Sequence, residues 1–259
     1  MAVHFTLDEG IGTVVIDRPN VRNAINMETL EGVSSALDTL KSEGAKVVVV
    51  AGAGSSFCAG ADLDLVRSAF EGDTEAVLGG LVDTLHPLIR KVRALPMPVI
   101  AAVEGPAVGA GAGLALAADL MVVAASAKLI PGYFGIGASP DGGVSYFLTR
   151  ALGAARTTSL VIQNRPLGAD ELVAAGLAES KVEDGQALES ALELARRVAG
   201  TPPLGLLRLR QLVDMATTQS LDAQLDLERQ LVAELWYTRD FREGVGAFLE
   251  RRPANFTGE

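Results

Sequence analysis

Apolar runs mark the strands of this chain before any motif is considered. Residues 5–8 and 11–17 predict a hairpin that turns at Glu9 and Gly10. Further along, continuous apolar runs are typical of strands buried on both faces of a sheet. Three such runs occur, at residues 47–51, 99–103 and 120–124.

Between these strands, apolar residues recur at helical spacing. In residues 27–42 the side chains of Leu30, Val33, Leu37 and Leu40 share one helical face. Further helices are predicted at residues 61–70, 74–95 and 110–118. This order of elements favours an α/β fold, either a parallel sheet or a coil of repeated ββα units.

After Gly185 the pattern becomes helical throughout. Helices are expected at residues 187–199, 203–216, 221–236 and 241–252. We expect a boundary near Pro202, with a core domain over residues 1–200 and a helical region over 201–259. Several leucines of that region would be costly to expose. It should therefore pack on the core or on a neighbouring subunit.

Charge and composition narrow the possible partners and the compartment. The formal net charge is −10 over 259 residues, which argues against nucleic-acid binding. Cys58 is the single cysteine, so an intramolecular disulfide is impossible and a reducing compartment is expected. Residues 99–118 carry only Glu104 as a charge, but Gly105 and Pro106 interrupt them, so no membrane span is expected. The first residues do not resemble a signal peptide. A cytoplasmic protein is predicted.

Motifs for metals and common cofactors are missing from the sequence. Gly109 and Gly111 are followed by Leu114 where a dinucleotide-binding motif has its third glycine. The two histidines, His4 and His86, are too few and too far apart for zinc spacing. No Gly-x-Ser-x-Gly sequence marks a nucleophilic serine. Neither a bound metal nor a separate cofactor is expected.

Three glycine-containing segments carry the candidate chemistry. Residues 57–62 and 109–113 each follow an apolar strand and precede a predicted helix, so each can present unpaired backbone N–H groups. Two such donors aimed at one carbonyl oxygen form an oxyanion hole. The third segment, residues 140–143, supplies Asp141 as a proton carrier. Two alternatives stay open, namely glycines serving tight turns and Asp141 capping a helix that starts near Val144.

Five segments in order resemble the crotonase (enoyl-CoA hydratase/isomerase) superfamily over essentially the whole chain. They are Asp17-Arg18-Pro19 with Asn23-Ala24, and residues 57–62, 98–105, 107–111 and 247–252. The resemblance implies a coil of ββα units followed by a C-terminal helical trimerisation region. It also implies an acyl-CoA thioester as the substrate, with coenzyme A entering as part of it. Assembly as a homotrimer, or as a hexamer made of two trimers, is expected.

The resemblance also assigns roles to the three segments. The oxyanion donors map to the amides of Ala61 and Ala110. The two glutamates with which hydratases activate water fall on Gly113 and Tyr133. Asp141 lies where several isomerases of the superfamily carry their acid/base. The chain is therefore most similar to the branch with ring-1,2-epoxyphenylacetyl-CoA isomerase and Δ3-Δ2-enoyl-CoA isomerases. A shift of a double bond, or opening or rearrangement of a ring epoxide, is expected.

Alternatives to an isomerase follow from the same residues. A hydratase with displaced acids is one. His86 lies where 4-chlorobenzoyl-CoA dehalogenase has a histidine, which keeps a hydrolytic dehalogenase or thioesterase using Asp141 and His86 open. The alternatives for His86 are a substrate contact and an ordinary residue on a helix face. The missing glutamates also suit an acyl-CoA-binding protein without catalysis. Tyr133 either lines the acyl pocket or fills the space of the absent glutamate. Further apolar lining is expected from Leu129, Ile130, Phe134, Ile136 and Phe147.

Two separate stretches are expected to hold the coenzyme A moiety. By resemblance, Asn20, Val21, Arg22 and Ala59 wrap the nucleotide, and the C-terminal Phe248 and Arg251 match positions near the adenine and the phosphate. The alternative for these last two is a solvated helix end whose arginines complement the helix dipole.

Overall fold

A hairpin opens the chain in the computed structural model, which describes residues 2–259. Strands β1 (Val3–Asp8) and β2 (Ile11–Ile16) pair in antiparallel fashion, as predicted. Glu9 and Gly10 form the turn with φ of +47° and +81°. Two successive positive φ angles match the twist of the flanking strands, which is why glycine suits the second position.

The main sheet has six strands in the order β1-β2-β3-β4-β6-β9. Strands β3 (Val47–Gly52), β4 (Val99–Val103), β6 (Leu120–Ala124) and β9 (Ser180–Val182) all run parallel to β2. The strands predicted at residues 47–51, 99–103 and 120–124 are confirmed.

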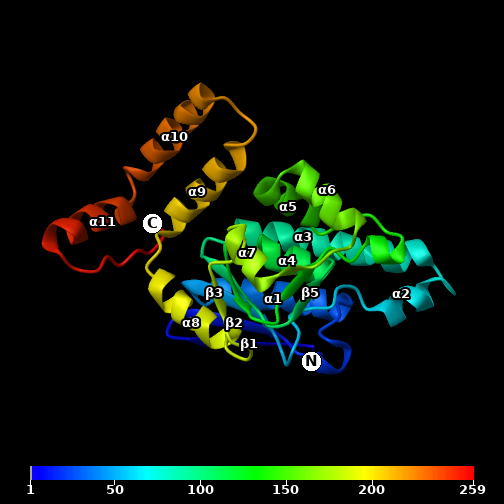
Figure 1. Ribbon diagram of the computed structural model, residues 1–259. Coiled ribbons are helices and arrows are strands. Elements are labelled where there is room, and N and C mark those ends of the chain that lie inside the picture. The colour runs from blue at the N-terminus through cyan, green and yellow to red at the C-terminus, as the bar shows by residue number, and fades with distance from the viewer. Residues whose placement is uncertain (1) are drawn as a thin grey trace.

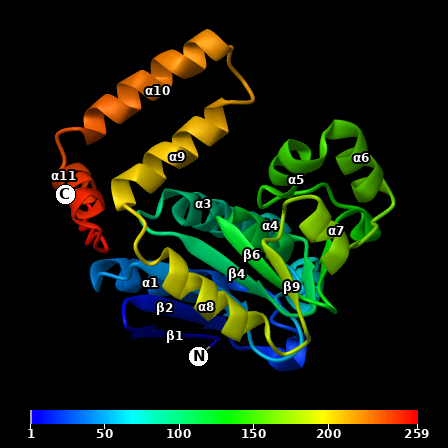
Figure 2. The same cartoon turned by 60° about the vertical axis from the view of Figure 1, so that its left-hand side comes forward.

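Both faces of this sheet are covered, which explains the unbroken apolar runs. Val48 and Val50 face the larger core cluster, which includes apolar residues of α1 (Met27–Ser42). Val49 faces a second cluster together with Leu194 of α8 (Ala187–Val198). Figure 2 shows α8 lying across this second face. A strand buried on both faces has no polar side to alternate with.

A second sheet of three short strands runs beside the first. It consists of β5 (Pro106–Val108), β7 (Lys128–Ile130) and β8 (Leu167–Gly168), in that order. Two isolated bridges, Ile25 to Ala61 and Cys58 to Ala107, extend the same kind of pairing toward the N-terminus. Each turn of the chain thus adds a strand to the main sheet, a short extended segment to the second sheet, and then a helix. This arrangement is a coil of ββα units.

Helices differ from their predicted bounds at two places near the second sheet. The helix expected at residues 61–70 is the shorter α2 (Leu63–Ala69), because Asp62 caps it through the Asp64 amide. The helix expected at 74–95 is divided into a π-helical turn, Glu75–Gly79, and α3 (Gly80–Ala94).

Helix α4 (Ala110–Ala117) is buried all round, in keeping with its composition of alanine, glycine and leucine. Three helices, α5 (Val144–Leu152), α6 (Ala154–Ile162) and α7 (Ala169–Ala174), follow β7.

The last three helices project from the sheets. They are α9 (Pro203–Met215), α10 (Leu221–Leu235) and α11 (Arg239–Glu250). Figures 1 and 2 both show α9 and α10 as an antiparallel pair, with α11 far from α4. Many of their apolar side chains are exposed, including Leu221, Leu225, Tyr237, Phe248 and Leu249. None of the helices in residues 2–259 is long and apolar enough to cross a membrane.

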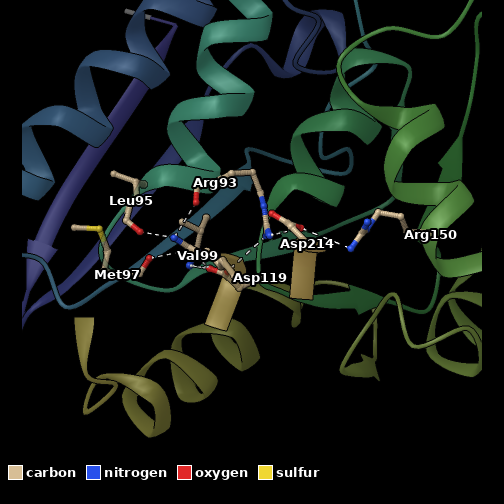
Figure 3. A network of polar contacts seen from close by, with 8 residues as sticks. Arg93, Leu95, Met97, Val99, Asp119, Arg150 and Asp214 are labelled. Atoms are coloured by element: carbon tan, nitrogen blue, oxygen red, sulfur yellow. Dashed lines mark hydrogen bonds and ion pairs between the residues drawn. The ribbon is translucent and has the colours of Figure 1, made fainter. Parts of the chain in front are cut away.

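A buried arginine fastens α9 to the core. The Arg210 guanidinium donates to both carboxylate oxygens of Asp119, at 2.7 and 2.5 Å. It also donates to the carbonyl oxygens of Arg93, Leu95 and Met97, which lie at and beyond the end of α3. Figure 3 shows these carbonyl groups converging beside Asp119, with Asp214 and Arg150 continuing the network. The polar contacts fix the base of the C-terminal helices.

Candidate active site

The loop that carries Ala61 is held from both sides by backbone hydrogen bonds. Ile25 N–H donates to the Gly60 carbonyl at 2.7 Å, and Asp62 N–H donates to the Ile25 carbonyl at 2.9 Å. An ion pair between Arg18 and Asp62, at 3.0 Å, closes the same loop. Ala61 therefore lies in an isolated bridge before α2 rather than in the first turn of the helix predicted at residues 61–70. The role of its amide as an oxyanion donor stays a prediction.

Ala110 is the first residue of α4 and is reached through a strained turn. Gly109 precedes it with φ of +52° and ψ of −118°, a conformation that requires glycine. Val108 N–H donates to the Cys58 carbonyl at 2.9 Å and ties this turn to the Ala61 loop. A Cβ atom on Gly60 would lie 3.9 Å from the Ala110 nitrogen, so the two loops meet there.

The amides of Ala61 and Ala110 are available as donors. Within the described residues, neither N–H donates to a backbone carbonyl. Backbone donors left unpaired beside one another are what an oxyanion hole requires. The arrangement can hold a carbonyl oxygen that gains negative charge.

Asp141 lies beside this pair of loops. The turn that follows it uses Gly142 and Gly143, with φ of +55° and +82°. A Cβ atom on Gly142 would lie 3.8 Å from the Ala110 Cα, which places the turn against the start of α4. The side chain of Asp141 does not cap α5, because Gly143 occupies the cap position and no side chain bonds there. The capping alternative is therefore wrong.

Tyr133 contacts Asp141 directly. Its hydroxyl donates to the Asp141 Oδ1 at 2.6 Å and lies 3.2 Å from the Asp141 carbonyl oxygen. The ring is buried against Gly109, where a Cβ atom would lie 3.6 Å from the ring carbon Cζ. Burial raises the pKa of the Tyr133 hydroxyl far above its usual range, and the Asp141 carboxylate adds to the rise. The hydroxyl consequently keeps its proton and acts as a donor.

His86, on α3, also reaches the Asp141 turn. Its Nε2 accepts a hydrogen bond from Gly142 N–H at 3.4 Å. This contact assigns the ring proton to Nδ1 in the neutral tautomer. The histidine predicted as a helix-face residue or a substrate contact is thus brought to the site.

Gly113 lies directly under the same turn. A Cβ atom there would be 2.4 Å from the Gly142 carbonyl oxygen, closer than side chains tolerate. By resemblance, the first hydratase glutamate is expected at this position and the second at Tyr133. Neither carboxylate is present, and the backbone of the Asp141 turn fills the space that the first would need.

The predicted coenzyme A contacts separate into two groups. Asn20 and Val21 lie exposed in a short 3₁₀ turn, and Arg22 follows it. Ala59 N–H donates to the Arg22 carbonyl at 2.9 Å, so these four residues form one surface. Phe248 is exposed on α11 and Arg251 ends that helix, on the part of the molecule distant from α4 (Figures 1 and 2).

The predicted apolar lining is divided as well. Leu129 is buried under the site, and Ile130 and Phe147 are partly buried. Phe134 and Ile136, however, are 49% and 60% exposed. Both side chains lie at the surface of the single chain, because the loop after Tyr133 runs over that surface. Their place in the apolar lining stays a prediction.

Interactions that support the site were not predicted. The buried Asn23 side chain donates to the Ala53 and Ser56 carbonyls, at 2.9 and 2.7 Å, and so shapes the loop before Ala61. Asn164 accepts from Gly132 N–H at 2.8 Å and holds the segment that carries Tyr133. Its turn-forming neighbours, Gln163 to Pro166, were the signal available in the sequence. Over residues 2–259, no group of three or more His, Cys, Asp or Glu side chains could hold a metal ion.

Comparison with known proteins places this geometry in a family. The family model for enoyl-CoA hydratase/isomerase matches residues 6–259. The chain belongs to the enoyl-CoA hydratase/isomerase family. It is 37% identical over 257 residues to a probable enoyl-CoA hydratase of Rhodobacter capsulatus, covering 99% of this chain and 98% of the relative. It is 36% identical over 255 residues to the 1,2-epoxyphenylacetyl-CoA isomerase of Escherichia coli, covering 98% and 97% of the two chains.

Solved structures of enoyl-CoA hydratase/isomerase relatives share the fold. The crystal structure of an enoyl-CoA hydratase from Polaromonas superposes with a TM-score of 0.93 at 32% identity, covering 99% of this chain and all of that one. The resemblance to the crotonase superfamily and the predicted crotonase-like α/β fold are confirmed. The chain is an enzyme of the enoyl-CoA hydratase/isomerase family.

Proposed function

We propose that this enzyme is an acyl-CoA isomerase that moves a double bond, or rearranges a ring epoxide, next to a thioester. The observation that carries the proposal is that a Cβ atom on Gly113 would lie only 2.4 Å from the Gly142 carbonyl oxygen. Position 113 therefore has no room for the first glutamate of a hydratase, and Asp141 is the carboxylate that lies near Ala110. One acid that takes and returns a proton is sufficient for an allylic isomerisation.

In the proposed reaction Asp141 removes a proton from C2 of a 3-enoyl-CoA. The electrons of that C–H bond pass to the thioester oxygen, and the resulting dienolate is held by the Ala61 and Ala110 amides. The protonated Asp141 then gives its proton to C4. The double bond now lies between C2 and C3, and no atom has been gained or lost.

Hydration by the usual arrangement is less well supported. It needs two carboxylates to place and activate a water molecule, and positions 113 and 133 carry glycine and tyrosine. The names of relatives do not separate the activities, because they include both hydratases and an isomerase.

Product mass separates the two activities. We would incubate the enzyme with a 3-enoyl-CoA, and separately with a 2-enoyl-CoA, and analyse the products by liquid chromatography with mass spectrometry. An isomerase gives a new chromatographic peak of unchanged mass, whereas a hydratase adds one water. Hydration without isomerisation would refute the proposal.

A hydrolase using Asp141 and His86 is the second candidate, because His86 reaches the Asp141 turn. Its Nε2, however, accepts from Gly142 N–H and is not poised to take a proton from water. Release of free coenzyme A thiol, or of halide from an aryl-CoA, would favour the hydrolase.

Assembly belongs to the same proposal. Residues 201–259 would serve as the assembly region of a homotrimer or a hexamer, because their exposed apolar side chains need covering. Asn20, Val21, Arg22 and Ala59 would then hold coenzyme A together with Phe248 and Arg251 of a neighbouring subunit. Light scattering after size-exclusion chromatography would test this, since a monomer would contradict it.

A further inference from the structure

The geometry points to Tyr133 as a positioning residue, whose hydroxyl anchors one oxygen of Asp141 so that the other oxygen carries the proton. This inference rests on the proposed function, since it assigns a partner to the proposed acid/base. It gives Tyr133 a role beyond filling the space of a missing glutamate.

The two carboxylate oxygens of Asp141 differ in their hydrogen bonds. Oδ1 accepts from the Tyr133 hydroxyl at 2.6 Å, a short bond of the kind formed with a charged acceptor. Oδ2 has no hydrogen-bond partner within residues 2–259. One oxygen is therefore fixed, and the other is available to exchange a proton with substrate.

Tyr133 is itself held in place by neighbours that leave it little freedom. Asn164 Oδ1 accepts from the Gly132 amide, immediately before the tyrosine. The Tyr133 carbonyl accepts from the amides of Ile136 and Ala138, both at 3.0 Å. Its ring packs against Gly109, where a Cβ atom would lie 3.6 Å from the ring carbon Cζ. A donor held this firmly can hold the group to which it donates.

Few other titratable groups surround the pair. Nε2 of His86, on α3, accepts a hydrogen bond from Gly142 N–H. Cys58, in the loop before Ala61, adds slightly to the raised pKa of Tyr133. Helix α4 consists of alanine, glycine and leucine and contributes no charge. On α5, Arg150 is bonded to Val213 and Thr217, away from the site. The Tyr133 hydroxyl is accordingly the direct hydrogen-bond partner of the carboxylate.

Removing the hydroxyl should lower kcat without a matching change in KM. Tyr133→Phe removes the donor that fixes the Asp141 Oδ1 atom, so the carboxylate gains rotamers while the contacts that bind acyl-CoA stay in place. We expect kcat to fall about 10-fold, with KM nearly unchanged. Tyr146→Phe, a half-exposed tyrosine on α5, is the matched control and should match the wild type.

Other kinetic outcomes would overturn the inference. If Tyr133→Phe behaved like Tyr146→Phe, the tyrosine would be a space-filling residue. If it abolished turnover as completely as Asp141→Asn, Tyr133 would be a proton carrier itself.

A second measurement does not depend on turnover. The chain has three tyrosines, so ¹³Cζ-labelled tyrosine gives an NMR spectrum in which Tyr133 is identified by its absence in Tyr133→Phe. Its signal in the wild type should differ from its signal in Asp141→Asn, because the carboxylate that accepts the hydrogen bond is replaced by an amide. A wild-type enzyme without isomerase activity but with this difference would refute the proposed function alone. The same Tyr133 signal in both proteins would refute the role of Tyr133.

Discussion

A Cβ atom on Gly113 would lie 2.4 Å from the carbonyl oxygen of Gly142, so α4 and the Asp141 turn touch through bare backbone. Even Gly113→Ala must displace one of them. We expect it to reduce the free energy of unfolding by about 1–3 kcal/mol, as overpacked interiors do, and to reduce turnover by shifting Asp141. Chemical denaturation and steady-state kinetics measure the two effects.

The matched control for this substitution is Gly80→Ala. Gly80 opens α3, and a side chain there meets nothing within 4 Å. We expect no loss of stability, and a gain of up to about 1 kcal/mol because alanine restricts the unfolded chain. Equal effects of the two substitutions would contradict the contact. Gly113→Glu should likewise fail to produce hydratase activity.

Cys58 provides a probe of the oxyanion loop. The thiol is fully buried, and burial raises its pKa from 9.0 to about 12. Because the pKa is raised, the thiol of the folded state stays protonated to a higher pH than the thiol of the unfolded chain. The resulting stability is present below pH 9 and is lost as the pH rises toward 12. A thiol-specific reagent at pH 8 should therefore react with the native enzyme only as fast as the chain unfolds. Rapid reaction in native buffer would show that the loop opens.

Arg210 should contribute far more to the free energy of unfolding than an exposed arginine does. Arg210→Ala leaves the partly buried Asp119 carboxylate with the Val99 amide and Arg93 as its remaining partners. It also removes the donor to three backbone carbonyls. Breaking such a pair costs about 3–5 kcal/mol. Arg239→Ala, which removes only an exposed ion pair with Glu259, should cost about 0–1 kcal/mol. Denaturant midpoints of the two variants test the difference, and similar values would refute the account of α9 docking.

Assembly can be tested by a single charge on α10. Leu225 is 51% exposed in one chain, so Leu225→Glu should leave the monomer folded. If α10 contributes to a trimer, the variant should elute as a smaller species with unchanged circular dichroism. Glu228→Gln, on the same helix, is the control and should keep the assembly. An unchanged mass for Leu225→Glu would exclude this face from the interface.

Sequence patterns predicted the parts of the fold that repeat over many residues. The run at residues 47–51 showed a buried strand because both its faces are covered. The second sheet was missed, since strands as short as Leu167–Gly168 have no periodicity to detect. At the site, motifs indicated Asp141, Ala61 and Ala110, whereas the hydrogen bond from Tyr133 and the clash at Gly113 depend on how distant backbone segments meet. Asn164 lies 32 residues from the amide that it holds, a distance that no local pattern spans.

Conversion of a 3-enoyl-CoA to its conjugated 2-enoyl isomer tests the central claim most directly. The reaction is followed by ultraviolet absorbance for the wild type and for Asp141→Asn, with acyl-CoA binding measured on both. The account predicts turnover by the wild type and a loss of about 10²–10⁴-fold in the variant, the usual contribution of a general acid/base, with binding retained. A wild type that binds acyl-CoA esters but does not convert them, or an Asp141→Asn enzyme of undiminished activity, would contradict it.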